Sequence, residues 1–558
     1  MKLLVLVLLL TAVFARSVPY TIYHTTDVHG WLLPKRHNPT EDADFGDLQS
    51  MIEHTNSTAL SKKENVLLFD SGDQVQGTGL SDATDVVGSV ILETTAKLPY
   101  DGLTIGNHEL GVPDTMDWIK KNYNHLHSGR MISANIYYQD EKLFAANHRI
   151  AKGPSSGHHI LTFGFMYDDR YPHKNTRVET VQKTVQSPEF KAILHNNKNV
   201  AFIVVLCHFP HTNKETKTIL NAIRNVHPKL GVVFLMGHRH LQQWNQLDRN
   251  AYAMESGCYY HSIGKLTFSL DEETGELQDV DHKWIKANRE ELIKEADVQE
   301  KHFDTKKGVA IRKFINKKFN DLKLGEVFGC AKRTYSRYEP ISNPNSIFRL
   351  FINDVFPTVE VESSNQQIFV MNTGSIRTHM YEGEVTRDDV MAIDPFDNPY
   401  VVFYELSLKQ LQDLLHSLHF FGDYGVSEDG SNRLPNYYHV WYEDGYPAYD
   451  VVTDEYTAVK LQQVLKVIDP SKDWDYEKYT SKFASSRSAF EHFIKNSPDF
   501  RCPMKLEDGK FYIPANQLPY ILGAAVMVSA ILSIGISLFI RRPKEMTLLD
   551  EDLEECLL

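Results

Sequence analysis

Short apolar runs rich in β-branched and aromatic residues recur through roughly the first 270 residues, and helix-like segments separate many of them. The runs predict strands at Tyr20–His24, Val66–Phe69, Phe202–Leu206 and Val232–Met236. The helix-like segments include Val87–Leu98 and Met116–His125. Strands that alternate with helices predict a layered α/β domain.

A second α/β region follows a polar, lysine-rich stretch. The segment Gln299–Asp321 is helix-prone and predicts a helix that links two domains. Beyond it, a region from about Glu326 to Met504 contains strand-like runs near Ile368–Met371 and Val401–Leu406. We therefore expect two α/β domains, at 18–290 and 326–510, with the linking helix within 291–325.

Two longer apolar runs lie near the ends of the chain. Residues 1–17 combine one lysine, an apolar run and small residues, which is typical of a signal peptide; the alternative is a buried N-terminal strand. Residues 518–540 are long and apolar enough to span a bilayer, and basic residues follow at once. The prediction is a type I membrane protein with a cytoplasmic tail at 541–558, whose Leu-Leu pairs could bind adaptors that sort to a vacuole- or lysosome-like compartment.

Charge and cysteines narrow the class of partner and compartment. The net charge of −14 argues against nucleic acid as a partner, but a small phosphorylated substrate remains open because metal ions can supply local positive charge. In an oxidising lumen, Cys330 and Cys502 would open and close the second domain and could form a disulfide. Cys207 and Cys258 lie in apolar contexts, which favours buried thiols, and Asn56 begins a glycosylation sequon.

Five strand-like runs of the first domain end in side chains that can bind metals. In chain order these are Asp27 and His29, Asp73, Asn107 with His108, His208, and His238 with His240. A single buried histidine is more often a packed core residue, but buried ionisable groups cost several kcal/mol unless they are paired or coordinated. Because the carboxyl ends of strands in an open α/β sheet meet in one crevice, the set predicts a site for zinc, manganese or iron(II).

The ligand pattern resembles that of the calcineurin-like metallophosphoesterases, in particular the 5'-nucleotidase family. The resemblance continues in the second domain, where 372–377 is similar to the family's Asn-x-Gly-x-Ile-Arg and 394–398 to its Pro-Phe-x-Asn segment. It implies an αββα sandwich followed by a 5'-nucleotidase-type α/β domain. It also implies two metal sites, one formed by Asp27, His29, Asp73 and His240, the other by Asp73, Asn107, His208 and His238.

The same resemblance assigns roles around the metals. Two metal ions would activate a hydroxide for attack on a phosphate monoester, while His108 would stabilise charge or protonate the leaving oxygen. Asn372, Arg377 and Phe396 would bind the substrate, with Arg377 on an anionic group and Phe396 on a nucleobase. A surface ion pair and a core phenylalanine are the alternative readings of Arg377 and Phe396.

The sequence departs from the family at two places. Many members carry an aspartate three positions after the catalytic histidine, whereas this chain has Gly111, so Asp114 or another carboxylate would have to orient His108. The late Gly-Gly-Asp-Gly segment is replaced by YTSKFASSRSAFEHF, which lacks that loop. Nucleotide hydrolysis is the leading prediction. Alternatives are a pyrophosphatase or phosphodiesterase acting on dinucleotides, nucleotide sugars or cyclic nucleotides, and a non-catalytic receptor.

Overall fold

The computed structural model describes residues 17–142, 147–168, 175–418, 425–426, 433–503, 505–507 and 510–512. The predicted membrane span and tail lie outside these residues, as does the predicted signal peptide except for Ser17. Among the described residues, no helix is both long and apolar enough to cross a bilayer.

Two sheets form the centre of the first domain. The five-stranded sheet has the order β14 (Leu277–Lys286), β13 (Ser262–Asp271), β1 (Ser17–Thr25), β2 (Asn65–Asp70) and β3 (Gly102–Leu103). The six-stranded sheet has the order β11 (Gln242–Asp248), β12 (Ala251–Ser256), β10 (Val232–Met236), β9 (Phe202–His208), β7 (His159–Met166) and β6 (His148–Lys152). The strands that lead to the candidate ligands run parallel within each sheet.

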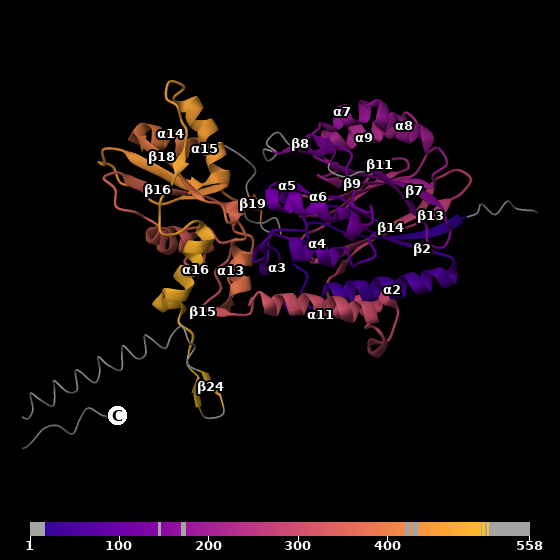
Figure 1. Cartoon of the computed structure of the whole chain (residues 1–558), viewed down its shortest axis with the longest axis horizontal. Coiled ribbons are helices and arrows are strands. Elements are labelled where there is room, and N and C mark those ends of the chain that lie inside the picture. Colours follow the sequence, from indigo (N-terminus) through magenta and orange to yellow (C-terminus); the bar gives the residue numbers. More distant parts are fainter. Residues whose placement is uncertain are drawn as a thin grey trace, which may run out of the picture.

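Helices cover the outer face of each sheet, so the layers follow the order helix, sheet, sheet, helix (Figure 1). On one side lie α2 (Phe45–Lys62), α10 (Arg289–Ala296) and α11 (Lys306–Asp321); on the other lie α7 (Val181–Gln186), α8 (Pro188–Asn196) and α9 (Lys214–Arg224). Buried side chains of both sheets, among them Ile22, Leu67, Phe202 and Leu235, form one cluster between them. This is the αββα order that the resemblance implied.

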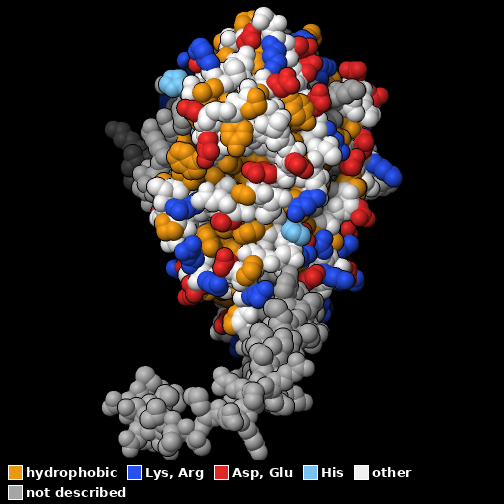
Figure 2. All heavy atoms as spheres, turned by 90° about the vertical axis from the view of Figure 1, so that its left-hand side faces the viewer, with side chains coloured by type: hydrophobic (Ala, Val, Ile, Leu, Met, Phe, Trp, Pro, Cys, Tyr) orange, Lys and Arg blue, Asp and Glu red, His pale blue; other side chains and the backbone are white. Residues whose placement is uncertain are grey.

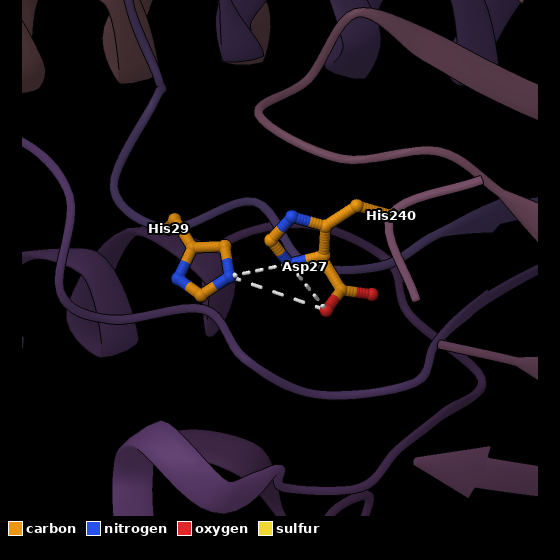
Figure 3. Close-up of side chains that lie close together, drawn as sticks. All are labelled: Asp27, His29 and His240. Carbon is orange, nitrogen blue, oxygen red and sulfur yellow. Dashed lines mark hydrogen bonds and ion pairs between the residues drawn. The ribbon is translucent and has the colours of Figure 1, made fainter. Parts of the chain in front are cut away.

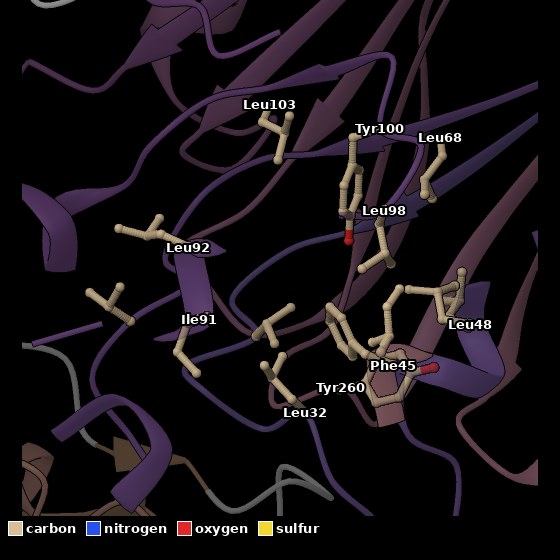
Figure 4. Packing of buried hydrophobic residues seen from close by; sticks show 14 of the residues in the cluster. Leu32, Phe45, Leu48, Leu68, Ile91, Leu92, Leu98, Tyr100, Leu103 and Tyr260 are labelled. Atoms are coloured by element: carbon tan, nitrogen blue, oxygen red, sulfur yellow. The ribbon is translucent and has the colours of Figure 1, made fainter. Parts of the chain in front are cut away.

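A second cluster packs the five-stranded sheet against its helical layer (Figure 4). Phe45 and Leu48 of α2 meet Leu68 of β2, together with Leu98 and Tyr260 from loops. Smaller elements complete the domain: α3 (Gly79–Asp82), α4 (Ser89–Thr95), α5 (Asn107–Leu110), α6 (Pro113–His127), β4 (Ile136–Tyr138), β5 (Glu141–Lys142) and β8 (Thr176–Val178).

The second domain is built on a five-stranded sheet with helices on both faces. Its order is β21 (Tyr437–His439), β16 (Gln366–Asn372), β22 (Tyr449–Asp454), β18 (Tyr400–Leu406) and β23 (Glu477–Lys478). Side chains alternate between the faces: Ile368 and Val370 pack with α14 (Leu408–Leu418) and α15 (Glu455–Ile468), whereas Phe369 and Met371 pack with α13 (Arg387–Ile393) and α16 (Ser486–Asn496).

Shorter elements frame this domain. They are β15 (Val327–Ala331), α12 (Ile347–Leu350), η2 (Phe351–Val355), η3 (Phe356–Thr358), η4 (Thr373–Ser375), β17 (Gly383–Thr386), β19 (Gly425–Val426), β20 (Arg433–Leu434), η5 (Pro498–Phe500), β24 (Lys505–Glu507) and β25 (Lys510–Tyr512). A disulfide joins Cys330 of β15 to Cys502, the pair that the sequence favours for a disulfide. Figure 2 shows the face of this domain, where apolar side chains lie among charges of both signs.

The predicted strands are present, but two predicted helices are shorter than expected. The run Val87–Leu98 forms α4 only from Ser89, because Gly88 before it has a left-handed backbone (φ 79°). In the linking segment the helix α11 begins at Lys306, where the Thr305 side chain accepts the Gly308 N–H; a 3₁₀ turn, η1 (Glu300–His302), precedes it.

The two domains meet along α3 and α13. The Gly79 N–H donates to Asp388 Oδ1 at 2.7 Å, and Arg36 donates to Asp389 at 2.8 Å. The ring of His37 stacks on that of Tyr381, with centroids 4.8 Å apart. Beside these contacts lies a cavity of about 570 Å³ whose walls come from both domains.

Candidate metal centre and active site

The candidate ligands lie at the carboxyl ends of strands from both sheets. Asp27 and His29 follow β1, Asp73 follows β2, and Asn107 follows β3 in the five-stranded sheet. His208 ends β9, and His238 and His240 follow β10 in the six-stranded sheet. The sequence predicts a site in the crevice of one open sheet. In the structure, the paired sheets bring two sets of strand ends to one point.

Three groups of side chains lie close enough to hold metal ions. They are Asp27–His29–His240, His29–Asp73–His108 and Asp73–His208–His238, and within each group the potential ligand atoms lie within 4.8 Å of one another. In the first group, His240 Nε2 lies 3.2 Å from His29 Nε2 and 3.3 Å from Asp27 Oδ1 (Figure 3). Nitrogen and oxygen atoms that converge in this way suit a divalent cation of the zinc, manganese or iron(II) kind.

Asp73 connects the groups. Its Oδ2 lies 2.9 Å from His208 Nε2 and 3.9 Å from both His29 Nε2 and His108 Nε2. Its Oδ1 accepts the backbone N–H of His108 at 2.8 Å. A carboxylate in this central place could serve as a ligand in two of the groups.

Backbone carbonyls orient two of the histidines. His29 Nδ1 donates to the carbonyls of Val75 (3.0 Å) and Gln76 (2.9 Å), and His208 Nδ1 donates to that of Ser71 (2.8 Å). Each of these bonds places a proton on Nδ1 and directs Nε2 into the site. Hydrogen bonds of this kind hold metal-binding imidazoles in the right tautomer.

One buried atom shows that the site fits metal ions. Asn107 Oδ1 is buried and, within the described residues, has no hydrogen-bond partner. A buried polar atom without a partner costs roughly 1–3 kcal/mol. Asn107 belongs to the predicted ligand set, and coordination to a cation would satisfy its Oδ1.

The pKa values of the candidate ligands are set by burial and by one another's charges. Burial alone would raise the pKa of Asp73, but the charges of His208 and His108 hold it well below its usual value. Burial alone would lower the pKa of His208, but the charge of Asp73 raises it to about 10. Burial lowers the pKa of both His29 and His238 to about 4. Asp73 therefore stays charged beside a protonated His208, while His29 and His238 are neutral.

Glycines make the close approach of the loops possible. A Cβ on Gly72 (φ 93°) would lie 2.5 Å from the backbone nitrogen of Gly106. A Cβ on Gly106 would lie 2.1 Å from Asp73 Oδ1. The loops after β2 and β3 therefore touch only because neither residue has a side chain.

Glu109 ties the same two loops together, a role that sequence reasoning missed. Its carboxylate accepts four backbone N–H groups: those of Gly106 (2.7 Å), Gln74 (2.7 Å), Val75 (3.1 Å) and Asp73 (3.2 Å). The available signal was its position, three residues after Gly106 at the start of a helix, where glutamate commonly forms a capping box.

The second domain reaches the metal ligands through Arg377. Its NH2 group donates to His108 Nε2 at 3.1 Å, and its guanidinium lies 5.1 Å from the centre of the Phe396 ring. Phe396 in turn lies 5.9 Å from the His108 ring. Asn372 lies at the end of β16, where its side chain accepts the Gly374 N–H. Arg377 and Phe396 are thus beside the metal site, whereas the Asn372 side chain is engaged with its own loop.

The late segment that departs from the family makes polar contacts with the two residues before Phe396. Ser486 Oγ donates to Asp394 at 2.6 Å, and Arg487 donates to the carbonyl of Pro395 at 2.9 Å. Tyr479 and Phe483, the aromatic residues at the start of the segment, are buried in the core of the second domain. Neither of these two aromatic rings forms a second wall for a nucleobase.

The structure also describes the predicted carboxylate, the predicted glycosylation site and the two cysteines outside the disulfide. Asp114 is exposed in the first turn of α6. Asn56 lies within α2 with its Oδ1 buried, which is unlike the surface loops where glycosylated asparagines lie. Cys207 is a buried thiol as expected, and Cys258 is a partly buried one.

Known families match both domains. Residues 20–242 match the model of the calcineurin-like phosphoesterases, and residues 334–450 match that of the NAD nucleotidase C-terminal domain. An uncharacterized protein of Schizosaccharomyces pombe is 28% identical over 74% of this chain and 77% of its own length. A secreted protein of Arthroderma benhamiae is 25% identical over 71% of this chain and 66% of its own.

A solved structure shares the arrangement of both domains. The 5'-nucleotidase of Candida albicans SC5314 superposes with a TM-score of 0.79 at 24% identity, over 86% of this chain and 98% of that one. The likeness shows that the order and fold of the two domains are common to both proteins. The chain therefore belongs to the calcineurin-like metallophosphoesterases with the two-domain organisation of the 5'-nucleotidase family, and it is a hydrolase of phosphoester bonds.

Proposed function

We propose that the chain hydrolyses phosphate monoesters of nucleotides at a centre of two divalent metal ions. The observation that carries this proposal is the contact between domains: Arg377 of the second domain lies 3.1 Å from His108, which stands beside Asp73. A guanidinium at this point is placed to bind a phosphoryl oxygen.

The proposed ligands divide into two sets that share Asp73. Asp27, His29 and His240 would complete one set, and Asn107, His208 and His238 the other. When bound, the two ions supply Lewis acidity to the phosphoryl oxygens and a nucleophilic hydroxide near neutral pH. Zinc, manganese and iron all suit these donors.

The protein side chains bind and orient the substrate. His108 Nε2 and the Arg377 guanidinium would face the phosphoryl group from opposite domains, and Phe396 would lie along the nucleoside, next to both. Among the described residues, Phe396 would form one of the two expected aromatic walls for the nucleoside, and the buried Tyr479 and Phe483 do not form the other.

A metal-dependent assay tests the proposal. The purified chain, loaded with manganese or zinc, is expected to release phosphate from nucleoside monophosphates and from p-nitrophenyl phosphate. Metal content is measured on the same sample. If metal is bound and no phosphate is released from any substrate, the proposal is wrong.

A second candidate substrate is a pyrophosphate, such as a dinucleotide or a nucleotide sugar. The cavity of about 570 Å³ favours it, because Arg377 and Arg337 both line it next to Tyr259. Tyr259 in turn packs against the rings of His29 and His240, at 5.4 and 5.2 Å. The cavity thus adjoins the metal site with room for a second phosphate.

Product analysis separates the candidates. A monoesterase releases inorganic phosphate and a nucleoside, whereas a pyrophosphatase releases two monophosphates from a dinucleotide. A cyclic nucleotide included in the same panel reports phosphodiesterase activity. The non-catalytic receptor considered from the sequence lacks support, since the catalytic side chains are gathered at one point.

For location, the disulfide and the secreted relative favour the secretory pathway. We propose in addition that residues 518–540 anchor the chain in a membrane with both domains on the lumenal or extracellular side, in a vacuole-like compartment or at the cell surface. Protease protection of intact membranes tests this topology: only the tail at 541–558 should be cleaved from the cytosolic side.

A further inference from the structure

Gln76 occupies a strained turn between two functional histidines. Its backbone is left-handed (φ 61°), which is uncommon for a residue with a side chain. Its N–H donates to Ser81 Oγ at 2.8 Å, and its carbonyl accepts from His29 Nδ1 at 2.9 Å. These two bonds fix the backbone of Gln76 beside the metal ligands.

The side chain of Gln76 points to the other histidine. Its Oε1 lies 2.8 Å from His108 Nδ1. A carbonyl oxygen only accepts hydrogen bonds, so His108 Nδ1 carries the proton. On the opposite edge of the ring, His108 Nε2 faces the Arg377 NH2 group at 3.1 Å, and a guanidinium only donates. Two neighbours therefore specify the same orientation and the same tautomer of His108.

Gln76 has no competitor for this role among the described residues. Of their carboxylate oxygens, none lies within 4.0 Å of His108 Nδ1; the one within that distance of the ring, on Asp73, faces Nε2 at 3.9 Å. Gly111 offers no side chain, and Asp114 is exposed at the start of α6. The orientation of the ring by a side chain at Nδ1 rests on Gln76.

We propose that Gln76 is a positioning residue for phosphoester hydrolysis: its side-chain amide holds His108 so that Nε2 faces the phosphoryl group. The proposal rests on the proposed function and deepens it. Gln76 acts through His108 and does not itself touch the substrate. The variant Gln76→Ala removes only the side-chain bond to His108, because the carbonyl that orients His29 belongs to the backbone.

A double-mutant cycle on the full-length, manganese-loaded chain tests the coupling. We expect Gln76→Ala to lower kcat roughly 10–100-fold and to change KM less than about threefold, as is typical when a group that orients an active-site ligand is lost. In the His108→Ala background, Gln76→Ala should cause no further loss, because its target is gone. Gln76→Glu keeps an acceptor at the same place and should retain kcat within about threefold of wild type.

A neighbouring glutamine provides the matched control. Gln74 lies in the same turn, but its side chain bonds Asp70 and Thr95 and does not reach His108. Gln74→Ala should lower the melting temperature at least as much as Gln76→Ala does. It should not cause the selective fall in kcat expected for Gln76→Ala. Losses from Gln76→Ala and His108→Ala that multiply in the double variant would overturn the proposal.

A structural readout is independent of activity. In a crystal structure of the Gln76→Ala chain we expect the His108 ring to leave its present orientation, while His29 stays in place and the bound metal per chain is unchanged. A His108 ring that keeps its orientation contradicts the proposal. If the wild-type chain hydrolysed no phosphoester, the proposed function would fail, yet this comparison would still decide whether Gln76 holds the ring.

Discussion

At the scale of single residues, the candidate metal centre is marked by unusual backbone angles. Asp27, His29, Asp73, His238 and His240 all have positive φ, between 48° and 85°. Such conformations are uncommon outside glycine and gather at functional sites, where surrounding contacts enforce them. The positive φ values turn the chain sharply after each strand, and the side chains of these loops converge on one site.

The central carboxylate provides the first prediction. Asp73→Asn keeps the shape of the side chain but removes the charge shared by both proposed metal sites. We expect kcat/KM to fall by roughly 10³-fold or more, with less than one metal ion retained per chain. Phosphate release and elemental analysis measure the two effects.

Asp279→Asn is the matched control, because Asp279 is an exposed aspartate on β14 with a similar φ of 51°. It should retain both activity and metal. If the Asp73→Asn chain kept full activity, the Asp73 carboxylate would not be needed for hydrolysis.

A buried carboxyl in the second domain provides a prediction about pH. Burial raises the pKa of Asp394 to about 7, although Ser486 donates to it. Between its unfolded pKa and about 7, the folded state holds a proton that the unfolded state has lost, so this group's contribution to stability falls as the pH rises. Asp394→Asn carries no such charge, so relative to wild type its free energy of unfolding should increase from pH 5 to pH 8.

The expected increase is about 2–3 kcal/mol, since one pKa unit corresponds to about 1.4 kcal/mol. Urea unfolding at several pH values measures it. Asp499→Asn, at an exposed carboxyl, should show no such trend. A pH-independent difference for Asp394→Asn would mean that this carboxyl is ionised at no cost in the folded chain.

At the scale of elements, the site is made by loops that bond to one another. The Asp27 N–H donates to the Gly72 carbonyl, the His29 N–H to that of Asp73, and the Tyr259 N–H to that of Asp27, at 2.7 to 3.0 Å. The Glu109 carboxylate also accepts hydrogen bonds from four N–H groups of the loops after β2 and β3. The strands bring the loops together, and these bonds fix their shape.

Glu109→Gln tests the contribution of that carboxylate. A glutamine offers one carbonyl oxygen and an NH2 group, so some of the four N–H groups would face another donor. We expect the free energy of unfolding to fall by roughly 2–4 kcal/mol, and metal binding to weaken, because unpaired buried donors are costly. Calorimetry measures both quantities.

Glu93→Gln removes a carboxylate of α4 that pairs with Lys97 at a partly exposed site, and should change either quantity by less than about 0.5 kcal/mol. If Glu109→Gln behaves like this control, water or neighbouring side chains must satisfy the loop N–H groups.

The sequence allowed the strands and the candidate ligands to be predicted because their signal is local. An apolar run that ends in Asp27 and His29, or in His238 and His240, is visible within a dozen residues. The contact of Gln76 with His108 could not be predicted, since it depends on a left-handed turn and on loops 32 residues apart. The approach of Arg377 to His108 spans 269 residues and was not predicted, since the family resemblance assigned Arg377 only to an anionic group of the substrate.

At the scale of the whole molecule, one covalent bond and several polar contacts organise the second domain. The disulfide joins positions 172 residues apart, from β15 at the start of the domain to the segment after α16. Arg36 and His37 of the first domain pair with Asp389 of the second, and Gly79 donates to Asp388. These contacts hold Arg377 against the first domain.

Removal of the disulfide should act on the second domain alone. Cys330→Ser, or the double variant with Cys502→Ser, should lower the free energy of unfolding by about 3–5 kcal/mol, because the bond closes a very long loop in the unfolded chain. Hydrogen exchange followed by mass spectrometry should show lost protection in β15 and α16, with α2 unchanged. Equal loss of protection in α2 would mean that the two domains unfold as one unit.

The bond between Arg377 and His108 has a consequence for affinity. The nitrogen that would face the phosphoryl group is already engaged by a donor from the other domain. Every substrate must therefore break this charge-assisted hydrogen bond before it forms its own, so the Arg377–His108 contact competes with the ligand. A weaker Arg377–His108 contact would tighten ground-state binding of the substrate. Loss of Arg377 itself would abolish this increase in affinity, because the guanidinium would no longer bind the phosphoryl group. Substrate affinity should therefore be greatest at an intermediate strength of the contact.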